Sequence, residues 1–175
     1  MQVSANCTVE ILHLFISAGH NYLGHFGKPP GEHPTEEQSQ IQCEAGLGIA
    51  GDRFYGHEEN FKGQITFFDM EVYEHMRAHF NVPACPPSAM RRNVLLRGAD
   101  LNQFIGQLFS LQGIEFEGME ECRPCFWMNQ AVAPGAEEFL KGKGGLRARI
   151  LSSGILQTGP CELTVVQQQD HHANR

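Results

Sequence analysis

Short runs of β-branched and aromatic residues recur along the chain, separated by turns that carry glycine or proline. Residues of these two classes favour strands, and glycine and proline mark the turns between them. Gly113, for example, separates two such runs. The segment 154–159 is predicted to be a turn that joins the last two strands. The pattern predicts eight strands, at residues 8–17, 39–44, 63–68, 92–97, 108–112, 114–118, 146–152 and 162–167.

Helical spacing of apolar residues is clearest after Asp69, where Val72, Met76 and Phe80 recur at every fourth position. Asp69 is a suitable N-cap, so a helix is predicted over 70–80. A second helix is predicted over 136–141, whereas 126–128 are predicted to form a loop. Strands with two inserted helices favour a mostly β fold, an antiparallel β-barrel with a few helices, over alternating βαβ units.

The chain has 175 residues, of which 41% are hydrophobic and 19% charged, and its formal net charge is −7. This composition predicts one domain over residues 1–175, with a core at about 8–166 and a polar tail at 167–175. The negative charge argues against nucleic-acid and membrane partners. The longest early apolar run, 11–18, is interrupted by His13 and is too short to be a signal peptide or a membrane span. We therefore expect a cytoplasmic protein.

Six cysteines are present, and a reducing cytosol would keep them as thiols. Only Cys122 and Cys125 have motif spacing, and a structural zinc site would need a second such pair. Two interpretations remain open. One cysteine acts as a thiolate ligand or nucleophile, which Arg123 would favour, or both are buried small residues.

A glycine-rich segment, 46–51, matches GxGxxG, but no helical pattern follows it, so a turn is predicted rather than a dinucleotide site. Several arginines stand at strand starts or turns, where guanidinium groups suit a phosphate or carboxylate, although solvated or paired arginines would give the same pattern. These are Arg53, Arg91, Arg92, Arg147 and Arg149.

The long connection 18–37 contains three histidines, His20, His25 and His33, without fixed spacing. Imidazole is a common metal ligand, but exposed loop histidines fit the pattern better than a metal cluster. Loops of this length without periodicity are usually functional or disordered.

Seven motifs in one order resemble the MOSC domain family, named for the C-terminal domain of molybdenum cofactor sulfurases, over about residues 8–166. They indicate a stand-alone bacterial-type member. The motifs are GIAGDR at 48–53, QITFF at 64–68, RRNVL at 91–95, GADLN at 98–102, IG at 105–106, CRPC at 122–125 and GLRARIL at 145–151.

The resemblance implies a β-barrel that binds a molybdopterin cofactor, with Cys125 in the position of the family cysteine that holds molybdenum or a transferable sulfur. It places Arg92 and Asn93 as the cofactor-contacting pair and gives Cys122 a supporting role. Further cofactor-binding residues by position are Arg53, Arg147 and Arg149.

The function implied by the resemblance is a molybdenum-dependent oxidoreductase that reduces N-hydroxylated small molecules. Because the chain has no flavin or iron–sulfur motif, we expect a separate electron-donor protein. Two alternatives remain open: a sulfur carrier or transferase that uses a Cys125 persulfide, and a cofactor-binding module without catalysis. The loop 19–34 is not part of the family pattern, and we expect it to cover the cofactor mouth or to set substrate choice.

Overall fold

The computed structural model describes residues 6–21 and 29–166. Strands dominate this part of the chain, and the helices are short. The strands are β1 (Asn6–Ile16), β2 (Glu36–Gln38), β3 (Gln40–Glu44), β4 (Gly48–Ile49), β5 (Ile65–Asp69), β6 (Val94–Arg97), β7 (Leu108–Leu111), β8 (Ile114–Glu121), β9 (Leu146–Ile150), β10 (Gly154–Gln157) and β11 (Gly159–Val165). The helices are α1 (Met70–Phe80), α2 (Trp127–Ala131) and α3 (Ala136–Leu140), with 3-10 turns η1 (Pro87–Met90) and η2 (Leu101–Phe104).

Seven strands close into a barrel in the order β11-β7-β8-β9-β5-β6-β1, because β1 and β11 pair with each other at the ends of the series. β2 extends the same sheet beyond β1. The pairings are antiparallel except between β5 and β6, which α1 connects, so the barrel is mixed. The mostly β barrel predicted from the sequence is confirmed, with this one parallel pair added.

A second, three-stranded sheet has the order β10-β3-β4. Here the prediction of a turn over 154–159 is wrong, because residues 154–157 form β10 and pair with β3 from Gly154↔Cys43 to Gln157↔Gln40. The segment carries its apolar residue Leu156 inward and leaves Ile155 exposed. That single alternation was too short to be recognised as a strand.

The helix α1 has the predicted bounds. The Asp69 carboxylate accepts hydrogen bonds from the backbone N–H groups of Glu71 (2.8 Å) and Val72 (3.4 Å), as an N-cap should. At the other end, Asn81 adopts a left-handed conformation with φ of 52°. The buried face is formed by Met70, Tyr73 and Met76, so it is rotated from the predicted stripe.

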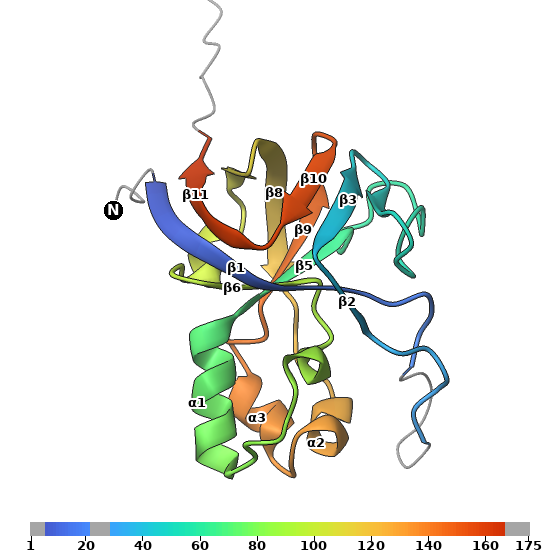
Figure 1. Ribbon diagram of the computed structural model, residues 1–175, viewed down its shortest axis with the longest axis vertical. Coiled ribbons are helices and arrows are strands. Elements are labelled where there is room, and N and C mark those ends of the chain that lie inside the picture. Colours follow the sequence, from blue (N-terminus) through green and yellow to red (C-terminus); the bar gives the residue numbers. More distant parts are fainter. Residues whose placement is uncertain (1–5, 22–28, 167–175) are drawn as a thin grey trace, which may run out of the picture.

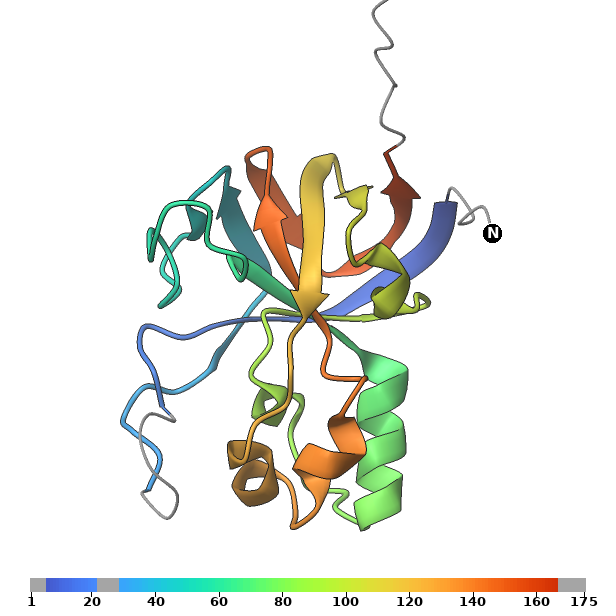
Figure 2. The same cartoon turned by 180° about the vertical axis from the view of Figure 1, so that it is seen from behind.

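The helices α1, α2 and α3 lie together at one end of the barrel (Figures 1 and 2). The predicted loop at 126–128 is wrong in part, because α2 begins at Trp127. Trp127 and Met128 are buried, and this burial stabilises a five-residue helix that has no side-chain cap.

Two apolar clusters correspond to this arrangement. The first fills the barrel with alternate residues of its strands, for example Ile114 and Phe116 of β8 and Ala148 of β9. The second joins α1, α2 and α3 to the outer side of the barrel through Phe68 and Leu95. The junction between the two clusters is where the candidate site lies.

Within the described residues, no helix is both long and apolar enough to cross a membrane.

Candidate functional site

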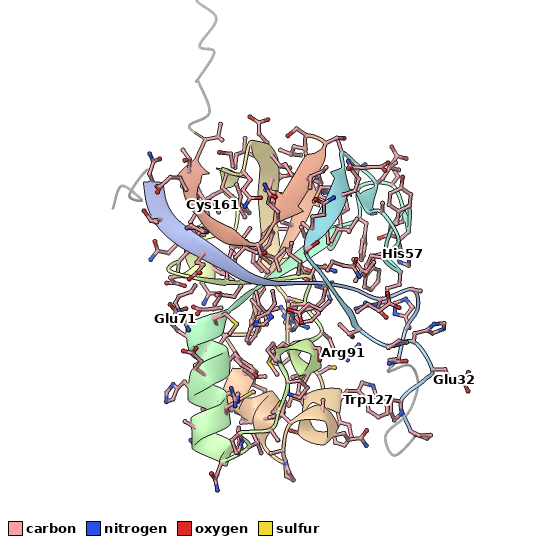
Figure 3. All side chains as sticks on the ribbon, viewed as in Figure 1. Glu32, His57, Glu71, Arg91, Trp127 and Cys161 are labelled. Atoms are coloured by element: carbon pink, nitrogen blue, oxygen red, sulfur yellow. The ribbon has the colours of Figure 1, made fainter. Side chains whose placement is uncertain are left out.

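A cavity of about 180 Å³ lies at the junction of the barrel and the helices. Figure 3 shows Arg91 there, between the barrel strands and α2. Six segments of the chain contribute to its wall. The lining residues are His20, Arg53, Phe54, Phe61, Gly63, Thr66, Arg91, Arg92, Asn93, Cys122, Arg123, Cys125, Met128 and Arg147.

Of the seven site residues predicted from the sequence, six line this cavity, and Arg149 does not. The Nε and Nη2 atoms of Arg149 donate to the carbonyl oxygen of Asn60 at 3.1 and 3.0 Å, and its Nη1 lies 3.4 Å from the Glu117 carboxylate. Arg149 therefore fastens the loop after β4 to the barrel wall.

Arg92 holds three separate segments together. Its Nε donates to the Gly144 carbonyl (3.0 Å), Nη1 to Met90 (2.9 Å) and Nη2 to Cys122 (2.9 Å). These bonds use three of the five guanidinium N–H groups. The segments are also in close contact, because a Cβ added to Gly144 would lie 2.3 Å from the Cys122 carbonyl oxygen. Arg92 thus positions the backbone around the cysteine motif, and two of its N–H groups remain for a ligand.

Asn93 is 7% exposed, and its amide group is occupied by the protein. Its Oδ1 accepts from the Thr66 backbone N–H (3.0 Å) and hydroxyl (2.9 Å), while its Nδ2 donates to the Phe15 carbonyl (3.2 Å) and lies 3.5 Å from Asp52 Oδ1. The side chain therefore connects the ends of β1 and β6 with β5. This is a positioning role for a residue that the family resemblance placed in contact with the cofactor.

Arg53 is a half-buried cation of the cavity wall that lies beside a buried carboxylate and an aromatic ring. Its side chain is 15% exposed, its Nη1 lies 3.6 Å from Asp52 Oδ1, and its guanidinium lies 4.9 Å from the centre of the Phe54 ring. Burial lowers the pKa of Arg53, and Arg92 lowers it further, whereas Asp52 and Cys122 raise it. The group stays charged at neutral pH, because arginine is protonated there even when its pKa is lowered, and within the described residues its one ion pair is with Asp52.

The two motif cysteines differ in environment. Cys122 is buried, its N–H donates to the Gly145 carbonyl (2.8 Å), and its own carbonyl accepts from Arg92. Cys125 is exposed, and its carbonyl accepts from the N–H of Met128 at the start of α2. The alternative of two buried residues is therefore wrong for Cys125, whose thiol is accessible from the cavity wall.

The sequence did not single out several residues of this wall. Phe54 and Phe61, with ring centres 5.2 Å apart, supply an aromatic surface, and Thr66 and Met128 also line the cavity. Thr66 lies within the QITFF motif, and the sequence signal of the others was proximity to a motif, with Phe54 directly after Arg53 and Met128 three residues after Cys125. Phe54, Phe61 and Met128 give the cavity an apolar surface, and the Arg53 guanidinium lies against one of its rings.

His20 is half-buried and lines the cavity, so the expectation of an exposed loop histidine is wrong for this residue. Its ring packs edge-to-face on Phe54, with centres 5.0 Å apart. His33 is exposed, and His25 lies outside the described residues. In the ranges 6–21 and 29–166, no three His, Cys, Asp or Glu side chains are grouped to hold a metal ion.

Comparisons with known proteins agree with the barrel and with the motif order. In overall structure the chain is similar to the YuaD protein of Bacillus subtilis, with a TM-score of 0.73 at 19% identity over 93% of this chain and 98% of that one. It is also similar to YiiM of Escherichia coli, with a TM-score of 0.64 at 15% identity over 95% of this chain and 72% of that one. For YiiM of Geobacillus stearothermophilus the TM-score is 0.65 at 14% identity, over 93% of this chain and 77% of that one.

No curated protein matches the chain in sequence. The family model for the MOSC domain, however, matches residues 54–161, which is more than half of the chain and includes every lining residue of the cavity except His20 and Arg53. On this match, the chain belongs to the MOSC domain family.

Proposed function

We propose that this protein binds the molybdenum cofactor in the cavity and, with the cofactor bound, reduces N-hydroxylated small molecules. One observation carries the proposal: the exposed Cys125 and the guanidinium of Arg53 line the same cavity. The cofactor carries a metal at one end and a phosphate at the other. A cysteine thiolate is a soft ligand suited to the metal, and an arginine is suited to the phosphate.

The residues present fit this cofactor by their chemistry. A thiolate is a suitable ligand for a sulfur-preferring metal, and arginine recognises phosphate through its planar set of donors. The rings of Phe54 and Phe61 offer an apolar surface to a planar group. The cavity of about 180 Å³ is smaller than the roughly 300–1,000 Å³ usual for drug-sized ligands, so we expect it to enclose only part of the cofactor.

The proposed mechanism assigns a role to each group of residues. When bound, the cofactor supplies the two-electron redox chemistry that amino acids lack. The Sγ atom of Cys125 would hold the metal, and Arg53 and Arg147 would bind the phosphate. Arg92 and Asn93 fix the backbone segments that carry these groups, and Cys122 packs beneath them. The electrons would come from a separate protein partner, because the chain carries no flavin or iron–sulfur motif of its own.

The accessibility of Cys125 also favours a second candidate function. A thiol in reach of solvent and beside cationic groups can carry a sulfur atom as a persulfide and pass it to an acceptor. In that case the cavity would bind the acceptor and no redox metal would be needed. A third alternative, a cofactor-binding module without catalysis, uses the same contacts as the first.

Elemental analysis of the purified protein separates these functions. The protein would be produced in a host able to make the cofactor, as wild type, as Cys125→Ser and as Cys161→Ser, a matched control on β11 away from the cavity. We expect about one molybdenum per chain, with pterin fluorescence, in wild type and control, and loss of molybdenum from Cys125→Ser. We expect Cys122→Ser to reduce occupancy less.

Turnover then separates an enzyme from a storage module. Reduction of a hydroxylamine by the molybdenum-loaded protein with a chemical electron donor would support the oxidoreductase, and a loaded protein without turnover would support the module. Full molybdenum in Cys125→Ser would overturn the ligand assignment. No metal and no pterin in any variant, together with cyanide-releasable sulfur on Cys125, would favour the sulfur carrier.

A further inference from the structure

The segment that carries His20 is fixed to the cavity from both sides. The Ser17 N–H donates to Asp52 Oδ1 (3.0 Å), and the Ser17 hydroxyl donates to the Gly19 carbonyl (3.0 Å). On the other side, the Asn21 side chain accepts from the His33 N–H (2.7 Å), and the Asn21 carbonyl accepts from the N–H of Gly31 (2.6 Å). These contacts hold the residues on either side of His20, so its place on the cavity wall is defined by the fold.

Three groups that carry or can carry positive charge surround one ring, that of Phe54. The Arg53 guanidinium lies 4.9 Å, the His20 ring 5.0 Å and the His57 ring 5.5 Å from its centre. Arg91 lines the same cavity. Figure 3 shows His57 on the loop that follows β4 and Arg91 below it, toward the helices. Within the described residues, the imidazole of His20 makes no hydrogen bond, so both of its nitrogen atoms are available to a ligand.

The carboxylate beside this cluster, that of Asp52, already has an ion pair and hydrogen bonds within the protein. Asp52 is buried, and besides its ion pair with Arg53 it accepts hydrogen bonds from the N–H groups of Ser17 and Phe54. Burial lowers the pKa of His20, and Arg53, His57 and Arg91 lower it further, while Asp52 opposes them. With no ligand bound, the cluster therefore disfavours protonation of His20.

We propose that His20 belongs to the anion-binding part of the cavity and takes up a proton when a phosphate-like dianion binds there. This inference rests on the anion-binding part of the proposed function and adds to it a residue outside the matched family segment. A dianion offsets the charge of the arginines that repel the imidazolium and attracts the imidazolium itself. The protonated ring then donates a hydrogen bond to the anion from a nitrogen that has no hydrogen-bond partner among the described residues.

Proton uptake on binding makes the affinity depend on pH. If the anion stabilises the imidazolium by an amount equal to one pKa unit, binding is about tenfold tighter below the titration of His20 than above it. Sulfate is a suitable probe, because it stays a dianion over the whole range in which histidine titrates. Its own protonation therefore does not contribute to the effect.

The experiment measures sulfate affinity by calorimetry at about pH 5 and about pH 8, because the pKa of His20 lies below the ordinary histidine value, and the titration of the His20 ring by NMR with and without sulfate. The variants are His20→Gln, Arg53→Gln and His75→Gln. His75 is an exposed histidine on α1 outside the cavity and serves as the matched control. Cofactor-free protein is used throughout, so the readout does not depend on catalysis.

We expect wild type and His75→Gln to bind sulfate about tenfold more tightly at the lower pH, and the His20 resonance to titrate at higher pH when sulfate is present. His20→Gln should bind with little pH dependence, and Arg53→Gln should bind weakly at both values. Sulfate affinity with the same pH dependence in His20→Gln would overturn the inference and leave the cofactor proposal standing. No sulfate binding to wild type at either pH would overturn both the inference and the anion-binding role of the arginines.

Discussion

Replacing Arg92 by lysine tests whether this side chain mainly positions the backbone around the cysteine motif. The guanidinium donates to three carbonyls at 2.9–3.0 Å, from Met90, Cys122 and Gly144. A lysine ammonium keeps the positive charge but has no planar fork, and it can reach at most one of these carbonyls. Arg92→Lys therefore removes at least two hydrogen bonds and leaves the charge of the cavity unchanged.

Hydrogen bonds from a charged group are worth about 1.5–3 kcal/mol each. Arg92 is partly exposed, so the lower figure applies, and the loss of two bonds should reduce the free energy of unfolding by about 3 kcal/mol. With a urea dependence of about 1–3 kcal/mol per molar, the midpoint should fall by roughly 1–3 M. The variant should still fold, because domains of this kind have stabilities of about 5–15 kcal/mol.

Urea unfolding followed by the fluorescence of Trp127, the single tryptophan, measures this change. Arg147→Lys is the matched control, because Arg147 is 38% exposed and its ion pair with Glu120 is long, at 3.7 Å, so the substitution should cost less than about 1 kcal/mol. Below the unfolding transition, Cys125 should also react with a thiol reagent at a changed rate in Arg92→Lys. Equal stability of the two variants, together with an unchanged rate, would refute the positioning role of Arg92.

Three further predictions concern other groups. In the native protein, Cys125 should be alkylated first, and Cys43 only after unfolding, because Cys43 is buried and burial raises its pKa to about 12. Mass spectrometry of partly labelled protein measures the order of labelling, and early labelling of Cys43 would contradict this prediction. Asn93→Asp places a carboxylate about 3.5 Å from Asp52 and should cost about 2–4 kcal/mol near pH 8 and less near pH 5, where one carboxyl takes up a proton; equal urea midpoints at both pH values would contradict this. Burial raises the pKa of Asp69 from 3.8 to about 7, so between these pH values the native state retains a proton that the unfolded chain loses. The free energy of unfolding that this proton contributes is therefore lost as the pH rises from 3.8 through about 7. Asp69→Asn keeps the cap and should make the urea midpoint less dependent on pH over this range, and an unchanged profile would refute it.

Local patterns were sufficient to predict most of the barrel and the longest helix. The bounds of α1 follow from a carboxylate cap at Asp69 and a left-handed residue at Asn81, and both act within a few residues of the helix ends. The strands β8 and β9 alternate clearly between buried and exposed positions. By contrast, β10 and α2 are four and five residues long and depend on tertiary packing, which a local pattern does not contain.

The sequence indicated most residues of the candidate site but not their hydrogen-bond partners. Motif positions brought six of seven residues to the cavity, but the partners of Arg92 and Asn93 lie up to 78 residues away and are mostly backbone atoms, which leave no mark in the sequence. Arg149 lies two residues from Arg147 in the same motif and binds a loop carbonyl instead. His20 could not be identified because its position depends on contacts across the long connection that follows β1.

The pairing of β1 with β11 has a consequence for synthesis of the protein. Its partners, from Asn6↔Thr164 to Ile11↔Gly159, are about 150 residues apart in the chain. At a translation rate of about 5–20 residues per second, β1 waits roughly 8–30 s for the strand that covers its edge. During that time the nascent chain exposes an unpaired apolar strand, which is the kind of surface that chaperones bind and that aggregates when they are absent. Cellular yield of this protein should therefore depend on chaperone supply and on the speed of translation more than on the stability of the closed barrel.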